Sequence, residues 1–273
     1  MTLTAAIGRY NHTEHLFDDK ALAIEPFPVI SRAFAAMVRE QRFDVSEMAI
    51  ATFLMARAAG SDLVLLPVIL AARPQTGALL RRADNAFGPA DLAGRRIGVR
   101  AYSQTTGLWL RGMLHDDQGL RPQDSHWVTF EDAHVVSFRD PPWAERAPAG
   151  SDMLSMLRAG DLDAAIFGNE IPSAPDLAPV YPDPAAAGRA FAATHGFDPV
   201  NHMLVLRADI ARQPGQARAL VEKLRPTNPY PIGRTALDPA ITLATRYAAA
   251  QGLIPSELTS DEIWAGLPPD AHA

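Results

Sequence analysis

Strand-length apolar runs alternate with helix-length amphipathic segments along this chain, and this order constrains the fold more than any other feature. Residues 3–8, 44–49 and 63–69 have the composition of buried strands, whereas residues 29–41 and 52–59 place apolar side chains near a 3.6-residue period. A strand, a crossover helix and a following strand form a parallel unit with helices on the sheet faces. The order therefore predicts an α/β fold.

The alternation begins again after Val99, which indicates a second structural unit. Its predicted elements are a helix at 106–114, a strand at 127–130, a helix at 153–159 and a strand at 163–167, and a last strand at 202–206 returns to the first unit. A chain of 273 residues is long enough for two lobes of ordinary size. We expect a first lobe of residues 1–99 and 201–273 and a second lobe of residues 100–200. Each would hold a mixed sheet with helices on both faces, and a ligand would bind in the cleft between them.

Charge and composition narrow the possible partners. The net charge of -6, without a clustered basic stretch, disfavours nucleic acid, and the absence of cysteine excludes disulfides and thiolate chemistry. The apolar run at 63–72 contains Pro67 and is shorter than the roughly 20 residues that span a bilayer, so no membrane insertion is expected.

Residues 1–8 lack a basic segment, which favours a cytoplasmic protein. A true start further upstream would instead make the protein periplasmic.

The candidate site follows from the strand order. In open α/β sheets, ligands bind beyond the carboxyl ends of the strands. The loops that meet this condition follow Gly8, Ala49, Ile69, Val99 and Phe167. We therefore expect the ligand-contacting residues in these five loops.

Several segments resemble a known family, the 4,5-dihydroxyphthalate decarboxylase-like proteins, which have the type II periplasmic-binding-protein fold. The segments that carry the resemblance are Tyr10-Asn11-His12-Thr13, residues 43–49 continuing into 53–57, Leu92-Ala93-Gly94-Arg95-Arg96-Ile97-Gly98-Val99, residues 106–112, residues 127–129, residues 154–164, and Tyr247 with residues 251–253. The Gly-Arg-Arg-Ile-Gly-Val piece recurs throughout type II binding proteins, whereas the Glu-Met and Leu-Trp-Leu-Arg-Gly pieces are more specific. The resemblance implies a two-lobed binding fold and a decarboxylase activity.

The chain departs from the family pattern where the substrate is expected. The family has an arginine in its first loop and a Pro-Arg-Pro-Pro stretch after a second-lobe strand, whereas this chain has His12 and residues 168–172, Gly-Asn-Glu-Ile-Pro. Two carboxylate anchors are thereby replaced, and the segment at 224–230 is shorter. The resemblance still implies that Tyr10 and Thr13, in the first loop, bind the ligand.

Ser103, Gln104, Thr105 and Thr106 join a predicted strand to a predicted helix. Hydroxyl groups and free backbone N–H groups at the positive end of a helix form a seat for an anion. An ordinary helix cap would have the same composition, and the family resemblance favours the ligand-binding alternative.

Glu47 and His12 are the candidate catalytic residues. Glu47 ends an otherwise apolar strand, where partial burial would raise its proton affinity, and His12 lies in a strand-end loop. Either could serve as a general acid. The alternatives are an ion pair of Glu47 with Arg57, a helix cap near Thr52, and a histidine without function.

Three further residues are candidate ligand contacts. Arg73 follows the third strand, and its guanidinium fork matches a carboxylate, although a solvated loop arginine is equally compatible. Asn169 would hydrogen-bond a neutral ligand group, and its neighbour Glu170 would repel a dianion. His202 begins the strand that returns to the first lobe.

A metal site formed by His12, His15, His202 and Glu47 has no compact ligand spacing in the sequence, so we expect neither a metal nor another cofactor. Trp109, Leu110 and Met113 have the spacing of core residues on one helix.

Two functions remain open. In the first, the protein is a cofactor-independent decarboxylase of a small hydroxylated aromatic acid, with Glu47 or His12 protonating the ring carbon that loses CO2. In the second, it binds a small acid without catalysis, as the solute receptor of an ABC-type transporter with a permease partner or as a cytoplasmic sensor.

Overall fold

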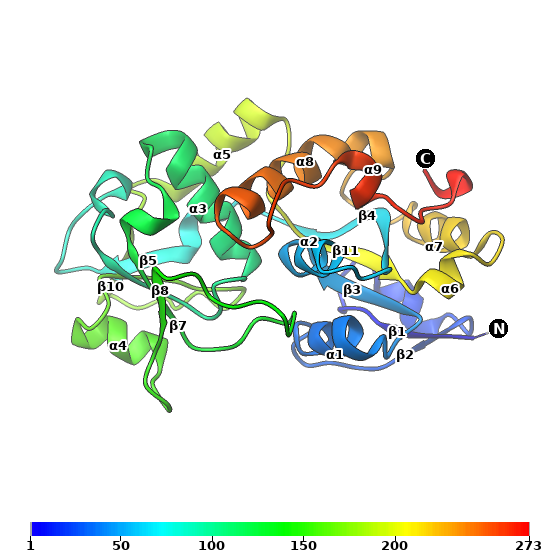
Figure 1. The fold of residues 1–273 in the computed structure, drawn as a ribbon, viewed down its shortest axis with the longest axis horizontal. Helices are drawn as coiled ribbons and strands as arrows, with labels where there is room; N and C mark the ends of the chain where they lie inside the picture. The colour runs from blue at the N-terminus through cyan, green and yellow to red at the C-terminus, as the bar shows by residue number, and fades with distance from the viewer. Residues whose placement is uncertain (1, 273) are drawn as a thin grey trace.

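The computed structural model describes residues 2–272, which form two sheets side by side along the long axis of the molecule (Figure 1). The first sheet has the strand order β2-β1-β3-β11-β4. Its strands are β1 (Leu3–Ala6), β2 (Leu22–Ile24), β3 (Val45–Ala49), β4 (Val64–Ala72) and β11 (Val200–Leu206). β1 is parallel to β2 and β3, whereas β11 is antiparallel to both β3 and β4. The sheet is therefore mixed, as predicted.

The second sheet has the order β10-β5-β9-β6-β7-β8. Its strands are β5 (Leu79–Arg82), β6 (Arg96–Val99), β7 (His126–Thr129), β8 (Ala144–Arg146), β9 (Ala164–Ile166) and β10 (Leu177–Pro179). The strands from β9 to β8 pair in parallel, and β5 is antiparallel to β9 and β10. The α/β class and the two-lobed arrangement are thus confirmed.

Helices surround both sheets. Their bounds are α1 (Arg32–Glu40), α2 (Ile50–Ala58), α3 (Thr105–Gln118), α4 (Met153–Ala159), α5 (Pro184–His195), α6 (Ala208–Ala211), α7 (Gln216–Leu224), α8 (Arg234–Ala250) and α9 (Ser260–Ile263). Single turns of 3₁₀ helix lie at Glu14–Asp18, Thr76–Ala78, Pro89–Asp91, Pro122–Asp124 and Pro269–Ala271. Within residues 2–272, no helix combines the length and apolar character that crossing a bilayer requires.

The boundary between the lobes differs from the prediction. β5 and β6 belong to the second sheet, although we expected the first lobe to extend through residue 99. The chain therefore leaves the first sheet after Ala72, through the 3₁₀ turn Thr76–Ala78, and not near Val99. Local periodicity identifies a short strand, but it does not show which sheet that strand joins, because its hydrogen-bond partners are distant in sequence.

The connections between the lobes run next to each other. β4 leads out of the first sheet, β11 leads back into it, and the two strands are hydrogen-bonded neighbours. Beyond the paired strands, the Arg73 N–H donates to the Pro199 carbonyl at 3.1 Å. The side-chain amide of Gln75 donates to Asn201 Oδ1 at 2.8 Å. The hinge is therefore a pair of cross-linked segments.

Two helices, α2 and α3, are buried over most of their length. Residues 50–56 of α2 and 105–114 of α3 are all buried, and α8 packs against both helices. Trp109 of α3 is fully buried and donates its indole N–H to the Val200 carbonyl at 2.7 Å, so its prediction as a core residue is confirmed. α2 follows β3 directly, because Ala49 ends the strand and is also the N-cap of the helix. The helix start is thereby held at the end of the strand.

Candidate active site

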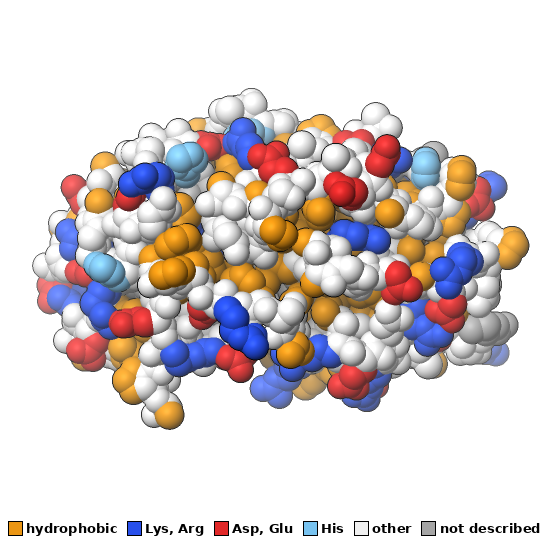
Figure 2. Space-filling model, in the orientation of Figure 1, with side chains coloured by type: hydrophobic (Ala, Val, Ile, Leu, Met, Phe, Trp, Pro, Cys, Tyr) orange, Lys and Arg blue, Asp and Glu red, His pale blue; other side chains and the backbone are white. Residues whose placement is uncertain are grey.

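A cavity of about 1020 Å³ lies between the lobes. The space-filling view shows apolar side chains in the middle of the molecule, between the lobes, and Lys and Arg side chains along the lower edge of this region (Figure 2). The predicted ligand contacts that line the cavity are Tyr10, Ser103, Gln104, Thr105, Thr106, Asn169 and His202. Loops distant in sequence therefore meet around one cavity.

Three helices without a side-chain cap begin at this cavity, and α4, which Asp152 caps, begins there as well. Ser31 and Arg32 lie at the start of α1, Ala49 at the start of α2, and Gln104 and the threonines after it at the start of α3. None of the three N-caps makes a side-chain hydrogen bond to its helix. The first N–H groups of α1 donate to the carbonyls of Val29, Ile30 and Ser31, and the Ala51 N–H of α2 donates to Thr105 Oγ1 at 3.4 Å. The free N–H groups therefore lie at the start of α3, and the positive ends of the helix dipoles face one cavity, which suits an anionic ligand.

Glu47 lies behind the cavity wall and is fully buried. Its carboxylate accepts hydrogen bonds from the Gly8 N–H at 2.8 Å and the Tyr10 hydroxyl at 2.6 Å, and Nδ1 of His202 lies 2.6 Å from the same carboxylate. Burial and then the charge of Glu47 raise the pKa of Tyr10 far above its usual range, so this hydroxyl remains a donor. Glu47 therefore acts on a ligand only through Tyr10 and His202.

Strand register explains how Glu47 and His202 meet. Leu204 of β11 lies opposite Glu47 of β3. His202 is two residues from Leu204, so its side chain projects from the same face of the sheet and is a diagonal neighbour of Glu47. The alternative in which Glu47 pairs with Arg57 is wrong, because the Arg57 guanidinium donates to the carbonyls of Leu63 and Ala265.

His202 is the part of this group that lines the cavity, and its side chain is 12% exposed. The ring packs edge-on against Phe34, with centroids 5.2 Å apart. Nδ1 is held by Glu47, and no protein group within residues 2–272 is hydrogen-bonded to Nε2. A ring fixed by a carboxylate on one nitrogen, with the other nitrogen free, can transfer a proton to a bound ligand.

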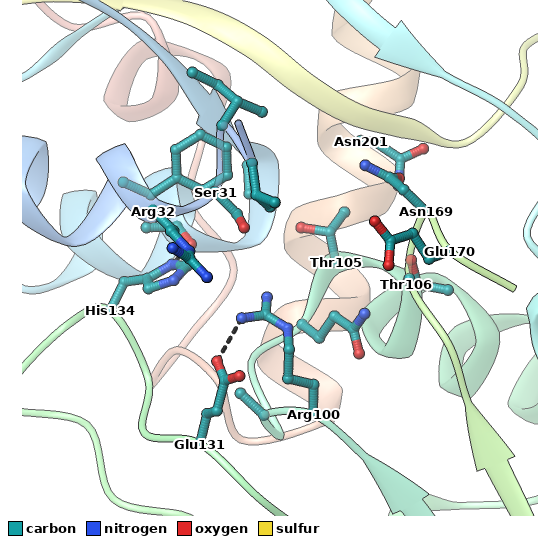
Figure 3. Close-up of a pocket in the computed structure, with 18 of the residues that line it drawn as sticks. Ser31, Arg32, Arg100, Thr105, Thr106, Glu131, His134, Asn169, Glu170 and Asn201 are labelled. Atoms are coloured by element: carbon teal, nitrogen blue, oxygen red, sulfur yellow. Dashed lines mark hydrogen bonds and ion pairs between the residues drawn. The ribbon is translucent and has the colours of Figure 1, made fainter. Parts of the chain in front are cut away.

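Sequence reasoning missed several cavity residues. Arg100 follows β6 and pairs with Glu131 at 2.6 Å, whereas Arg32 points into the cavity beside Ser31 and His134 (Figure 3). Arg100 could have been found from its position at a strand end. Nothing in the local sequence separates Arg32 from a surface arginine.

His134 lies on an irregular segment of the second lobe that reaches the first lobe. The guanidinium of Arg39, in α1, donates to the carbonyls of His134 at 2.8 Å and Ala133 at 3.0 Å. Thr52 Oγ1 is hydrogen-bonded to His134 Nδ1 at 2.9 Å. Burial, followed by the charges of Arg100 and Arg39, lowers the pKa of His134 to about 4. The ring is therefore neutral at pH 7.

This lowered pKa predicts a loss of stability in mild acid. Below pH 6.5 the unfolded chain binds a proton at His134 that the folded protein does not bind until about pH 4, so stability falls over this window. The expected loss between pH 7 and pH 5 is about 2 kcal/mol. Urea unfolding at several pH values measures it. His134→Asn keeps a polar atom for Thr52 and should remove this pH-dependent loss of unfolding free energy. A free energy of unfolding that falls by the same amount between pH 7 and pH 5 in His134→Asn would contradict the assignment.

A second cavity, of about 860 Å³, shares Tyr10 with the first and is lined by two further predicted residues, His12 and Arg73. His12 stacks on Tyr10 with ring centroids 5.3 Å apart, and burial lowers its pKa. Arg73 donates to the Gly168 carbonyl at 3.0 Å and to Asn169 Oδ1 at 3.1 Å. His12 and Arg73 do not line the main cavity, and Thr13 is fully buried with its hydroxyl donating to the Gly8 carbonyl at 2.7 Å.

A metal centre is not apparent in these side chains. Between residues 2 and 272, no three His, Cys, Asp or Glu side chains lie close enough together to hold a metal ion.

Two curated proteins resemble the chain in sequence. It is 26% identical over 297 residues to a 4,5-dihydroxyphthalate decarboxylase from Comamonas testosteroni, covering 100% of this chain and 88% of the relative. It is 29% identical over 210 residues to a 4,5-dihydroxyphthalate decarboxylase from Pseudomonas putida, covering 68% of this chain and 80% of the relative. No family model matches the chain. The resemblance drawn from the sequence is confirmed.

Solved structures show the fold. The periplasmic aliphatic sulphonate binding protein SsuA from Escherichia coli matches with a TM-score of 0.53 at 17% identity, covering 94% of this chain and 72% of that protein. A periplasmic sulfonate-binding protein SsuA from Methylobacillus flagellatus matches with a TM-score of 0.52 at 13% identity, covering 98% of this chain and 91% of that protein. The chain therefore has the two-lobed periplasmic-binding-protein fold.

Proposed function

We propose that this protein is a decarboxylase of a small hydroxylated aromatic acid. One observation carries the proposal: the Glu47 and His202 pair opens, through His202, onto the cavity at which α1, α2 and α3 begin. The two decarboxylases that match along the chain support it. The reaction breaks the bond between a ring carbon and a carboxylate, releases CO2, and replaces the carboxylate with a proton on the same ring carbon.

His202 is placed to deliver that proton. Its Nε2 is free, and the Glu47 carboxylate orients the ring and stabilises a positive charge on it. Tyr10 shares the Glu47 carboxylate and keeps it fully hydrogen-bonded. Glu47 is therefore a positioning residue, and His202 is the proposed proton donor.

The cavity lining offers such a substrate both cationic and apolar contacts. The start of α1, with the guanidinium groups of Arg32 and Arg100, suits a carboxylate that is retained in the product. Phe27, Ile30 and Phe34 form an apolar wall, and Phe34 touches the His202 ring. A carboxylate lost beside an apolar wall leaves as neutral CO2, which this environment favours over the charged parent. Closure of the lobes would exclude water from a cavity this large.

The test is a direct assay for binding and turnover. In a thermal-shift screen with 4,5-dihydroxyphthalate, 3,4-dihydroxybenzoate and phthalate, a ligand present at 100 times its Kd stabilises the protein by about 2.7 kcal/mol. Ligands that stabilise the protein are then incubated with it at pH 7, and CO2 and aromatic product are measured. We expect equimolar CO2 and decarboxylated product from at least one hydroxylated acid. Stabilisation by every bound acid without CO2 release would instead indicate a binding protein.

A further inference from the structure

The charges around the main cavity are nearly all matched. Its lining contains three arginines and three acidic side chains: Arg9, Arg32, Arg100, Asp152, Glu131 and Glu170. Arg9 pairs with Glu14, Arg100 pairs with Glu131, and Asp152 caps α4 by accepting the Ser155 N–H at 2.8 Å. Neither Arg32 nor Glu170 has an ion-pair or hydrogen-bond partner in the described part of the chain, so these two charges remain for a ligand.

The two unmatched charges lie on opposite sides of the cavity. Arg32 begins α1 of the first lobe, and Glu170 lies in the segment that follows β9 of the second lobe. Figure 3 shows Arg32 beside Ser31 and His134 on one side, and Glu170 beside Asn169 on the other, with Thr105 between them. A ligand across the cavity therefore meets a cation at one end and a carboxylate at the other.

We infer that Glu170 determines specificity by accepting hydrogen bonds from phenolic hydroxyl groups at the end of the substrate remote from the carboxylate anchor. An unpaired carboxylate repels a ligand carboxylate, but its two oxygens accept O–H donors in strong, charge-assisted hydrogen bonds. Two adjacent hydroxyl groups on a ring would present two such donors to one carboxylate. This inference rests on the proposed function, and it names the substrate class as aromatic acids with hydroxyl groups opposite a retained carboxylate.

The hydroxyl groups also have neutral partners nearby. Asn169 and Asn201 both line the cavity, and Asn201 is already held by Gln75 of the hinge at 2.8 Å. Their side-chain amides do not distinguish a carboxylate from a hydroxyl by charge. Glu170 makes that distinction, because a carboxylate attracts hydroxyl donors and repels anions.

The test compares two acids that differ only in their hydroxyl groups. Calorimetric titration at pH 7 with 3,4-dihydroxybenzoate and benzoate should show roughly ten- to hundredfold tighter binding of the dihydroxy acid by the unaltered protein. In Glu170→Gln this preference should fall by about tenfold, while benzoate binds equally well or more tightly because a like charge is removed. Glu257→Gln, an exposed change outside the cavity, is the matched control and should keep the full preference.

The same samples separate this inference from the proposed function. An unchanged preference in Glu170→Gln, or equal binding of both acids by the unaltered protein, would overturn the role of Glu170 even if CO2 is released from a hydroxylated acid. A preference that depends on Glu170, with no CO2 from any hydroxylated acid, would support the hydroxyl contact and overturn the decarboxylase proposal alone.

Discussion

Replacing His202 with asparagine should lower kcat for decarboxylation by roughly 10²- to 10⁴-fold, the usual contribution of a positioned general acid. The asparagine amide can still donate to Glu47 where Nδ1 does now, at 2.6 Å, so the carboxylate stays hydrogen-bonded. It cannot deliver a proton to a ring carbon. Because the start of α3 and the arginines are untouched, the Kd of a product such as 3,4-dihydroxybenzoate should change only a few-fold. Steady-state CO2 release and calorimetry measure the two quantities.

The matched control is His126→Asn, on the exposed first residue of β7, which lies outside both cavities. It should leave kcat unchanged. A His202→Asn protein with full kcat would show that the ring proton comes from another group. Equal losses of binding and turnover would show that His202 holds the substrate and does not transfer a proton.

Replacing Gly112 with alanine should reduce the free energy of unfolding by about 3 kcal/mol, at the upper end of the usual cost of overpacking a core. A β-carbon at Gly112 would lie well inside contact distance of three ring atoms of Tyr247. The ring cannot easily retreat, because its edge packs on Trp109, with centroids 5.8 Å apart, and its hydroxyl donates to Asp116 at 2.6 Å. α3 and α8 would have to separate. Urea unfolding measures the change.

Gly88→Ala is the control for this prediction. A β-carbon there would meet only the Asp91 carboxylate, at 3.9 Å, so the expected change is within about 0.5 kcal/mol. If Gly112→Ala were as stable as Gly88→Ala, the close approach of α3 and α8 at this point would be wrong.

Length alone did not decide which elements were predictable. The helix at 153–159 and the strand at 96–99 occur as predicted, and the strand expected at 163–167 is the three-residue β9. β2, β8 and β10 also have three residues each, and the sequence did not identify them. α5 is rich in alanine and lacks a clear apolar stripe.

The ends of α5 did carry a signal that apolar periodicity alone overlooks. Asp183 caps the helix by accepting the Ala186 N–H, Pro184 occupies its first turn, and Gly196 ends it in a left-handed conformation. These end signals would have identified the helix.

The site was predictable where its residues follow strands. Tyr10, Ser103 and Asn169 reach the main cavity because strand ends converge there. The depth of Glu47 was not predictable. Its side chain is fully buried behind that of His202, and this arrangement depends on the pairing of β3 with β11. Arg32 and His134 were missed because each reaches the cavity through the approach of two lobes, which local sequence does not encode.

The adjacent placement of β4 and β11 has a mechanical consequence. Both covalent connections between the lobes leave from neighbouring strands, and the Arg73 N–H and the Gln75 side chain cross-link them to Pro199 and Asn201. Twisting or sliding of one lobe past the other would break these hydrogen bonds, whereas swinging about the line of the two segments would preserve them. Such swinging keeps the wall at Asn201 still, and it has to break the hydrogen bonds of Arg39 and Thr52 to the segment at residues 133–134.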